Sequence, residues 1–211
     1  MIDWVALDVG ETLIDETRVW GAWAQELGIS PLTFSAALWA AIASGEDHGH
    51  VFDALGVPDW RRFGPAVEAR YGGFQGVDLY PDALGAVERI AAQGRSVAIL
   101  ANQPARRTAQ LLALGFRPDV IAMSEELGIA KPDPAFFARC LELMGRPDPR
   151  SVAYVGDRVD NDVVPSRAAG MRPVWIRRGP WGRLREDVNG DAELVVQSLD
   201  ELVERLPELE A

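Results

Sequence analysis

Short apolar runs alternate with helical patterns along most of the chain. The runs, typical of buried strands, lie at residues 4–7, 96–100, 120–123, 151–155, 173–176 and 194–196. Between them, helical spacing of apolar residues covers 81–92, 104–114, 134–144 and 163–169. Strands that are apolar on both sides, and that alternate with helices, form parallel sheets covered on both faces. We therefore predict an α/β fold with a parallel sheet.

Residues 15–76 show a helical pattern only. Val19, Trp23 and Leu27 recur every four residues, and Ser30-Pro31 is a typical helix start for a second helix reaching Ala43. Further helices are predicted at 51–55 and about 59–71. This pattern indicates a helical unit, residues 15–76, inserted into an α/β core formed by residues 1–14 and 77–211.

The end of the chain contains a loop and a helix. Residues 177–191 are charged and rich in turn formers, so we predict a loop there. Ser198 and Glu201 form a capping-box pattern that predicts a final helix.

Charge and cysteine content narrow the class of protein. The 211 residues carry a formal net charge of −11, which disfavours nucleic acid or an anionic membrane as a partner. The single cysteine, Cys140, lies in an apolar helical pattern and reads as a small buried residue, because no disulfide can form within the chain. No apolar run is long enough for a membrane span and no signal peptide is seen, so we predict a cytoplasmic protein.

Polar residues follow the strands where ligands of α/β sheets bind. Asp8, Asn102 and Asp157 each come directly after a predicted strand or within a residue of it, and Lys131 precedes a predicted helix. Asp8, Asp157 and Asp162 would converge beside Lys131 at one edge of the sheet. Clustered carboxylates need a cation, and oxygen ligands of this kind suit Mg²⁺.

Four motifs in order make the chain resemble the haloacid dehalogenase superfamily of hydrolases over nearly its whole length. They are Asp8-Val9-Gly10-Glu11-Thr12, the strand end at Asn102, Lys131-Pro132, and Gly156-Asp157 with Asp162. The resemblance implies a three-layer Rossmann-like core, and it identifies the helical insertion with the cap domain of that family, which closes over the site.

The resemblance also implies a role for each motif residue. Asp8 would be the nucleophile that forms an aspartyl-phosphate, and Lys131 would pair with its carboxylate. Thr12 would brace the turn, and it and Asn102 are the candidates for contacting substrate. The cofactor would be Mg²⁺, held by Asp8, the Gly10 carbonyl and Asp157, with Asp162 in or just behind that shell.

Two positions depart from the phosphatases of the superfamily. Gly10 stands where a second aspartate usually acts as general acid and base, a function worth about 10²–10⁴-fold in rate. Ala101 stands where a Ser or Thr usually contacts phosphate. Asn102 and Glu11 are candidates for replacing part of what is lost.

Three hypotheses of function remain open. The first is a Mg²⁺-dependent phosphohydrolase for a small anionic, phosphorylated substrate, weakened by Gly10 and better with acyl phosphates. The second is a dehalogenase-like hydrolase, since departing halide needs no acid, although Gly156-Asp157 keeps the metal-binding form. The third is a non-catalytic protein that retains the fold and binds metal or ligand.

Residues outside the motifs receive structural interpretations. His48 and His50 read as part of a solvated loop of the helical insertion, because no third ligand has metal-site spacing. Trp20 and Trp23 read as core residues of the insertion that could also line a substrate pocket. Arg158, Arg177 and Arg178 are left unassigned between substrate binding and surface ion pairs. The chain is expected to be a monomer or a homodimer.

Overall fold

A computed structural model describes residues 1–46, 48–185 and 190–210. Its centre is a six-stranded sheet in the order β3-β2-β1-β4-β5-β6, and every neighbouring pair is parallel. The strands are β1 (Trp4–Leu7), β2 (Ser96–Ala101), β3 (Val120–Met123), β4 (Val152–Gly156), β5 (Arg172–Ile176) and β6 (Leu194–Val196). The predicted parallel α/β sheet is confirmed.

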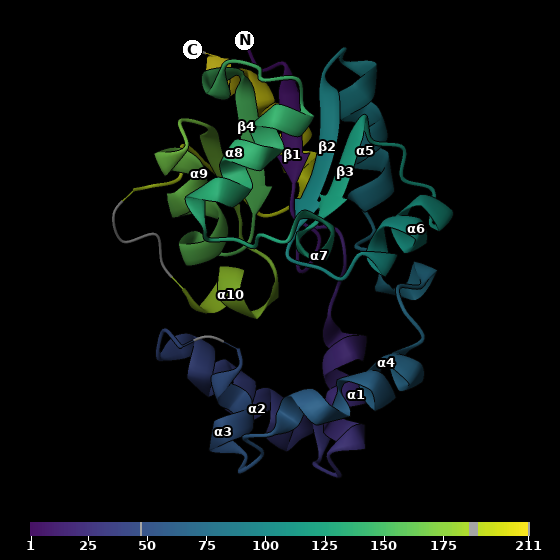
Figure 1. Cartoon of the computed structure of the whole chain (residues 1–211). Coiled ribbons are helices and arrows are strands. Elements are labelled where there is room, and N and C mark those ends of the chain that lie inside the picture. The colour runs from purple at the N-terminus through teal and green to yellow at the C-terminus, as the bar shows by residue number, and fades with distance from the viewer. Residues whose placement is uncertain (47, 186–189, 211) are drawn as a thin grey trace.

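Alternate strand residues pack against helices on opposite faces of the sheet. Val5 and Leu7 belong to a core shared with α5 (Ala83–Ala92) and α11 (Leu199–Arg205). Ala6, between them, belongs to a core shared with α8 (Pro134–Leu143). Figure 1 shows α8 and α9 (Val164–Ala168) in front of the strands. The result is the three-layer, Rossmann-like arrangement predicted above.

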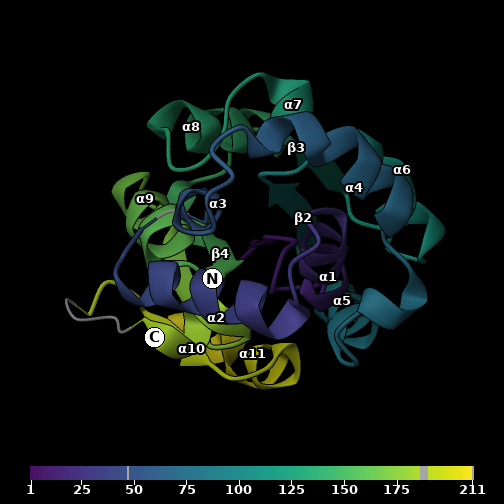
Figure 2. The same ribbon diagram turned by 90° about the horizontal axis from the view of Figure 1, so that it is seen from below.

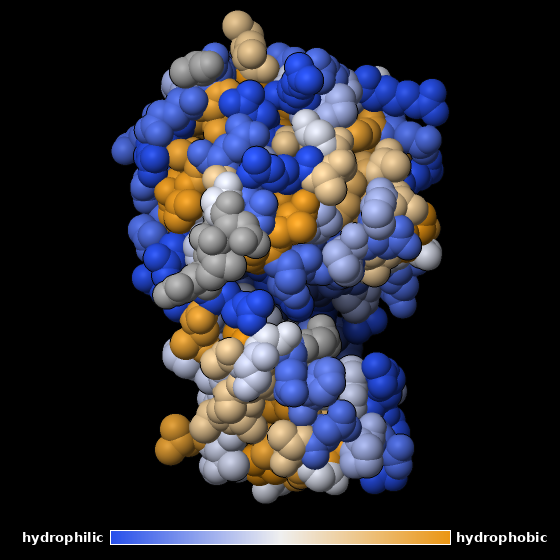
Figure 3. Space-filling view, turned by 90° about the vertical axis from the view of Figure 1, so that its left-hand side faces the viewer, coloured by the Kyte–Doolittle hydropathy of each residue, from blue (hydrophilic) through white to orange (hydrophobic). Residues whose placement is uncertain are grey.

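Four helices follow β1 and lie beyond the carboxyl ends of the strands (Figures 1 and 2). They are α1 (Thr17–Glu26), α2 (Pro31–Ala43), α3 (His50–Ala54) and α4 (Gly64–Tyr71). We call residues 15–76 the helical segment. It has its own apolar core around Phe34, Leu38 and Phe52, which Trp181 joins from the sheet-bearing part. Figure 3 shows the helical segment as a lower lobe that meets the rest of the molecule at a narrower waist.

The chain enters and leaves the helical segment through two linkers that are paired with each other. Ile14 and Leu79 form an antiparallel bridge, and the Asp15 N–H donates to the Asp78 carbonyl at 2.7 Å. Arg18, in α1, forms two hydrogen bonds of 2.7 and 2.6 Å to the Asp78 carboxylate. The start and the end of the segment are thereby fixed to one another.

Several predicted elements differ from the structure. The region 177–191 is not simply a loop, because Gly179–Leu184 forms α10, while residues 186–189 lie outside the described residues. The single helix expected at about 59–71 is a 3₁₀ turn, Trp60–Phe63, followed by α4, and Pro65 occupies the first turn of α4. The helix predicted at 104–114 begins later than expected, as α6 at Arg106, and a short helix that was not predicted, α7, covers Ser124–Leu127.

Other predictions for single features hold. The Ser198 hydroxyl accepts a hydrogen bond from the Glu201 N–H and caps α11. Cys140 is fully buried, and burial raises the pKa of its thiol to about 12. No single described helix is long and apolar enough to cross a membrane; α1 and α2 pass that test only as a pair bent by 115°.

Candidate active site

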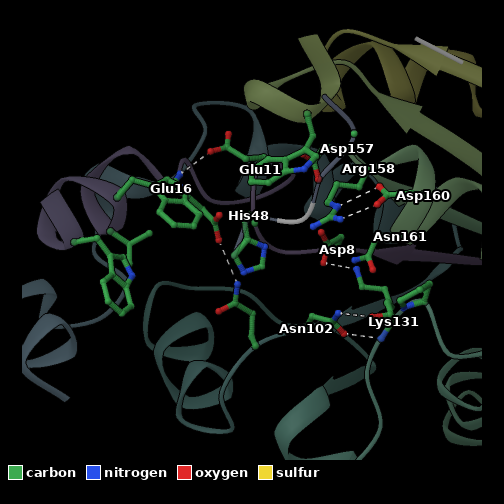
Figure 4. Close-up of a pocket in the computed structure, with 18 residues that line it drawn as sticks. Asp8, Glu11, Glu16, His48, Asn102, Lys131, Asp157, Arg158, Asp160 and Asn161 are labelled. Carbon is green, nitrogen blue, oxygen red and sulfur yellow. Dashed lines mark hydrogen bonds and ion pairs between the residues drawn. The ribbon is translucent and has the colours of Figure 1, made fainter. Parts of the chain in front are cut away.

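Three neighbouring strands deliver the predicted polar residues to one edge of the sheet. Asp8 follows β1, Asn102 follows β2, and Asp157 follows β4, and β1 lies between the other two. Lys131 comes from the loop between α7 and α8. Figure 4 shows these side chains grouped around a common space. Residues that are far apart in the sequence, Asp8, Lys131 and Asp157, therefore lie together at one edge of the sheet, as predicted.

Lys131 lies between two carboxylates. Its Nζ donates to Asp8 Oδ1 at 2.7 Å and to Asp162 Oδ1 at 2.6 Å, and its side chain is 1% exposed. Burial alone would lower the pKa of this ammonium group, but the charges of Asp162 and Asp8 hold it well above its ordinary value. Lys131 is therefore a fixed positive charge beside Asp8.

The three acids form a cluster with more negative charge than Lys131 can balance. Oxygen atoms of Asp8, Asp157 and Asp162 all lie within 4.8 Å of one another. Asp157 Oδ2 is buried and has no hydrogen-bond partner among the described residues. Burial, with the neighbouring Asp162 and Asp8 carboxylates, raises the pKa of Asp157 well above its ordinary value. An unpartnered buried carboxylate oxygen beside two further acids is a donor set that fits a divalent cation.

The loop after β4 positions two of these acids. The Arg158 N–H donates to Asp162 Oδ2 at 3.1 Å, and the Trp175 indole N–H donates to the Asp157 carbonyl at 2.8 Å. A single π-helical turn, Val159–Val163, carries Asp162 back toward Gly156. A Cβ on Gly156 would lie 2.3 Å from Asp162 Cγ, so only glycine allows this close approach.

The Asn102 side chain holds the Lys131 backbone. Its Nδ2 donates to the Lys131 carbonyl, and its Oδ1 accepts from the Lys131 N–H, both at 2.8 Å. Asn102 borders the cavity, but its amide group is engaged at both ends. Its amide therefore positions Lys131, and the expected contact of Asn102 with substrate stays a prediction.

Thr12 does not join the other predicted site residues. Its side chain is fully buried and does not line the cavity, and its hydroxyl has no hydrogen-bond partner among the described residues. Its backbone N–H donates to the Val9 carbonyl, which also accepts from Leu13 and Ile14. Thr12 thus lies inside the turn after Asp8. This place agrees with the expectation that Thr12 braces the turn, and its side chain is not placed to contact a substrate in the cavity.

Two glutamates flank Gly10. Glu11 has a positive φ of 50°, and its carboxylate accepts hydrogen bonds from the Glu16 N–H at 3.1 Å and from the Tyr80 hydroxyl. Burial raises the pKa of Glu11 to about 7. Glu16 lies at the start of α1, and burial, together with the charges of Glu11 and Asp8, raises its pKa to about 8. The Glu16 carboxylate, not a side chain of residue 10, occupies the space beside Gly10.

A cavity of about 590 Å³ opens between this edge of the sheet and the helical segment. Trp20 and Trp23 line it, as the sequence suggested, and Trp181 lines it from α10. His48 lines it too, with ring centroids 5.9 Å from Trp20 and 6.3 Å from Trp181. His48 lies in a turn and is half-buried, so the predicted loop position holds, but its place in the cavity wall was not predicted; His50 is exposed and lies outside the cavity.

The three unassigned arginines separate into two groups. Arg158 lines the cavity, pairs with Asp160 at 2.7 Å and lies over the Trp181 ring. Arg177 and Arg178 do not line it. Arg178 pairs with Asp82 at 2.6 Å, and Arg177 donates to the Gly182 carbonyl, so both have structural roles.

Sequence reasoning missed two residues that matter here. Trp181 was placed in a loop, although Gly179-Pro180 before it is an ordinary helix start. Glu16 received no role, because the turn over residues 9–14 that folds it back onto Gly10 cannot be recognised from apolar spacing. The one available signal was the glycine itself at position 10, which leaves room for another side chain.

Comparisons with known proteins agree with this geometry. A family model of haloacid dehalogenase-like hydrolases matches residues 2–170. A phosphoserine phosphatase of Thermus thermophilus is 32% identical over 85% of this chain and 76% of that protein. A glyceraldehyde 3-phosphate phosphatase of Methanocaldococcus jannaschii is 33% identical over 59% of this chain, which spans only 55% of that relative's length.

Solved structures resemble the fold over nearly the whole chain. A phosphatase from Thermococcus onnurineus has a TM-score of 0.64 at 22% identity, covering 97% of this chain and 98% of its own. An L-2-haloacid dehalogenase from Xanthobacter autotrophicus has a TM-score of 0.70 at 18% identity, covering 98% and 99%. At such identities the likeness concerns the fold alone. The family model, which matches most of the chain, shows that this chain belongs to the haloacid dehalogenase-like hydrolases, a family of enzymes.

Proposed function

We propose that the protein is a Mg²⁺-dependent phosphohydrolase that acts on a small phosphorylated metabolite through an aspartyl-phosphate on Asp8. The observation that carries this proposal is the cluster of Asp8, Asp157 and Asp162 around the buried Lys131 ammonium. A carboxylate nucleophile and a phosphate group repel each other, and this site provides one fixed cation and a donor set for a second.

Asp8, Asp157 and the Gly10 carbonyl would hold the ion, with Asp162 directly behind or within the same shell. Bound Mg²⁺ supplies positive charge that offsets the repulsion between carboxylate and phosphate. The unpartnered Asp157 Oδ2 supports this assignment, since that atom otherwise lacks any compensation for its burial. Asp162 is already bonded to Lys131, which supports a place partly behind the ion.

Lys131 pairs with the Asp8 carboxylate and orients it for attack on phosphorus. The reaction forms a bond between an Asp8 oxygen and phosphorus while the bond from phosphorus to the leaving group breaks. Water then attacks the aspartyl-phosphate, releases phosphate and regenerates Asp8. Asn102 fixes the backbone of Lys131 and so maintains the distance between the ammonium group and Asp8.

The helical segment would act as a cap with the boundaries 15–76. Trp20, Trp23 and His48 line the cavity from this segment, while Asp8 and Lys131 line it from the sheet. An aromatic wall above a charged floor suits a small substrate with an apolar body and an anionic end. The names of the phosphoserine and glyceraldehyde 3-phosphate phosphatases support a small phosphorylated compound as the substrate class.

The test compares two activities of the purified protein. Phosphate release from p-nitrophenyl phosphate is measured with Mg²⁺ and with a chelator, and halide release is measured from 2-haloacids. We expect Mg²⁺-dependent phosphate release, which Asp8→Asn abolishes and Asp3→Asn, an exposed control at the opposite end of β1, leaves intact. Halide release that persists with chelator would contradict the proposal and favour a dehalogenase. Neither activity, with Mg²⁺ still bound in calorimetry, would favour a non-catalytic protein.

A further inference from the structure

Gly10 has no side chain, so position 10 cannot supply the group that transfers a proton to the leaving group. Asp8 attacks phosphorus, and an alkoxide leaving group must receive a proton as it departs. Lys131 is engaged with two carboxylates, to which its ammonium group donates hydrogen bonds. Some other group near Gly10 must therefore serve a substrate with a poor leaving group.

The Glu16 carboxylate fills the space that a residue-10 side chain would take. A Cβ built on Gly10 would lie 2.6 Å from Glu16 Oε1 and 2.9 Å from Glu16 Cδ. No side chain larger than hydrogen fits at position 10 while Glu16 stays in place. Glycine at position 10 is thus what allows the Glu16 carboxylate to lie there.

Glu16 is also directed into the cavity that contains Asp8. Its Oε1 accepts a long hydrogen bond of 3.4 Å from Gln103 Nε2, and its side chain lines the cavity (Figure 4). Its own backbone is fixed by the Glu11 carboxylate, which accepts from the Glu16 N–H. The start of α1 therefore presents the carboxylate toward the reacting centre.

Glu11, the other candidate, also lines the cavity, but both oxygens of its carboxylate are already hydrogen-bonded. One of its carboxylate oxygens accepts from the Glu16 N–H and the other from the Tyr80 hydroxyl. A Cβ on Gly179 would lie 2.5 Å from Glu11 Oε2, which places this carboxylate against the first residue of α10. Glu11 is thus a positioning residue for Glu16.

We propose that Glu16 is the general acid and base of this enzyme, reaching from the helical segment into the space left by Gly10. In the first step the Glu16 carboxyl proton passes to the leaving-group oxygen as the bond to phosphorus breaks. In the second step the Glu16 carboxylate takes a proton from the water that attacks the aspartyl-phosphate. The proton balance closes over one turnover, and this assignment rests on the proposed phosphohydrolase function.

The test uses substituted phenyl phosphates, which share one shape but differ in the acidity of the leaving phenol. We expect kcat/KM of the wild-type protein to depend weakly on that acidity. Glu16→Gln should lower kcat/KM by about 10²-fold for unsubstituted phenyl phosphate and by only a few-fold for dinitrophenyl phosphate, whose leaving group needs no proton. A purely structural role would lower both equally, and that result would overturn the assignment.

Two further variants probe the space beside Gly10. Gly10→Ala puts a methyl group where Glu16 Oε1 lies, so it should produce the same selective loss without removing any carboxylate. The pair Gly10→Asp with Glu16→Ala moves the carboxylate back to position 10 and should restore activity toward phenyl phosphate relative to Glu16→Ala alone. Failure of this rescue in a protein that folds and releases phosphate from the dinitrophenyl ester would count against the assignment.

The matched control is Glu26→Gln, at the other end of α1 and outside the cavity, which should leave all rates unchanged. If the wild-type protein released phosphate from none of these esters, the proposed function itself would fail, and the role of Glu16 with it. If phosphate is released and all variants lose activity uniformly, only the role of Glu16 fails. The two failures are therefore distinguishable.

Discussion

At the scale of single residues, the site depends on side chains that hold other side chains in place. Asn102 bonds to both backbone groups of Lys131, and Lys131 in turn bonds to Asp8 and Asp162. A neutral amide can satisfy a donor and an acceptor of one residue at once, which a carboxylate cannot. The amide of Asn102 therefore provides the one donor and the one acceptor that the Lys131 backbone needs.

We expect Asn102→Asp to weaken both stability and catalysis. The new carboxylate still accepts from the Lys131 N–H but leaves the Lys131 carbonyl without its donor, which costs about 1–3 kcal/mol of unfolding free energy. A displaced Lys131 should lower kcat/KM toward p-nitrophenyl phosphate by up to about 10²-fold. Chemical denaturation and steady-state kinetics measure the two effects. Unchanged kcat/KM would show that Asn102 does not position Lys131.

Residue identities at the site could be predicted from the sequence where strand ends carry them. Asp8 and Asp157 follow apolar strands, and parallel strands end at the same edge, so their meeting could be foreseen. Glu16 and His48 could not, because they reach the cavity through turns and through packing of the helical segment. Thr12 was misjudged because its neighbours carry motif chemistry while its own side chain faces the interior.

At the scale of elements, the sheet and its covering helices could be predicted from the sequence, because the spacing of apolar residues reflects which side of each element is buried. Strand limits agree within a residue or two for β1 to β6. The short helix α10 was missed because its composition, with Gly179, Pro180 and Gly182, is typical of loops. Trp181 stabilises it through contact with the core of the helical segment, which is a tertiary effect.

The paired linkers make Asp78 the residue that fixes α1 to the end of the helical segment. Asp78 is 2% exposed and accepts hydrogen bonds from Arg18, from the Gln75 N–H and from the Tyr71 hydroxyl. Burial acts to raise the pKa of this carboxyl, but the hydrogen bonds from Arg18 and Gln75 hold it below the ordinary value. The folded state therefore favours ionised Asp78.

Asp78→Asn should destabilise the protein by about 2–3 kcal/mol at neutral pH. Because the pKa is lowered on folding, the stabilisation is complete above the unfolded value of about 4 and is lost as pH falls below it. The difference in unfolding free energy between wild type and variant should thus shrink in acid, as thermal unfolding at several pH values would show. The exposed control Asp59→Asn should change little. A pH-independent difference would contradict the role of the ionised carboxylate.

At the scale of the whole molecule, the arrangement of acids links metal binding to stability. Asp157 is buried beside two other carboxylates and has an unpartnered oxygen, so the metal-free protein carries uncompensated repulsion. A ligand that binds only the folded state adds stability in proportion to the logarithm of its concentration. We therefore expect bound metal to increase the free energy of unfolding.

We expect Mg²⁺ at about 100 times its Kd to stabilise the wild-type protein by about 2.7 kcal/mol. Asp157→Asn should raise the Tm of the metal-free protein, because one repelling charge is gone, and should abolish the increase caused by Mg²⁺. Calorimetric unfolding with Mg²⁺ and with chelator measures both effects. The surface variant Asp53→Asn should retain the full response to Mg²⁺. A lower metal-free Tm for Asp157→Asn would contradict the account of repulsion.

The acidic lining of the cavity has a kinetic consequence. Asp8, Asp157 and Asp160 face a space in which Lys131 and Arg158 are already paired with acids. A phosphate ester that arrived before the proposed ion would meet a repelling field, so we expect the cation to bind first and the ester second. Bound cation would then raise the affinity for the ester by the same factor by which bound ester raises the affinity for the cation. If Mg²⁺ binds here as proposed, its free concentration would set the fraction of molecules that can accept a substrate at any moment.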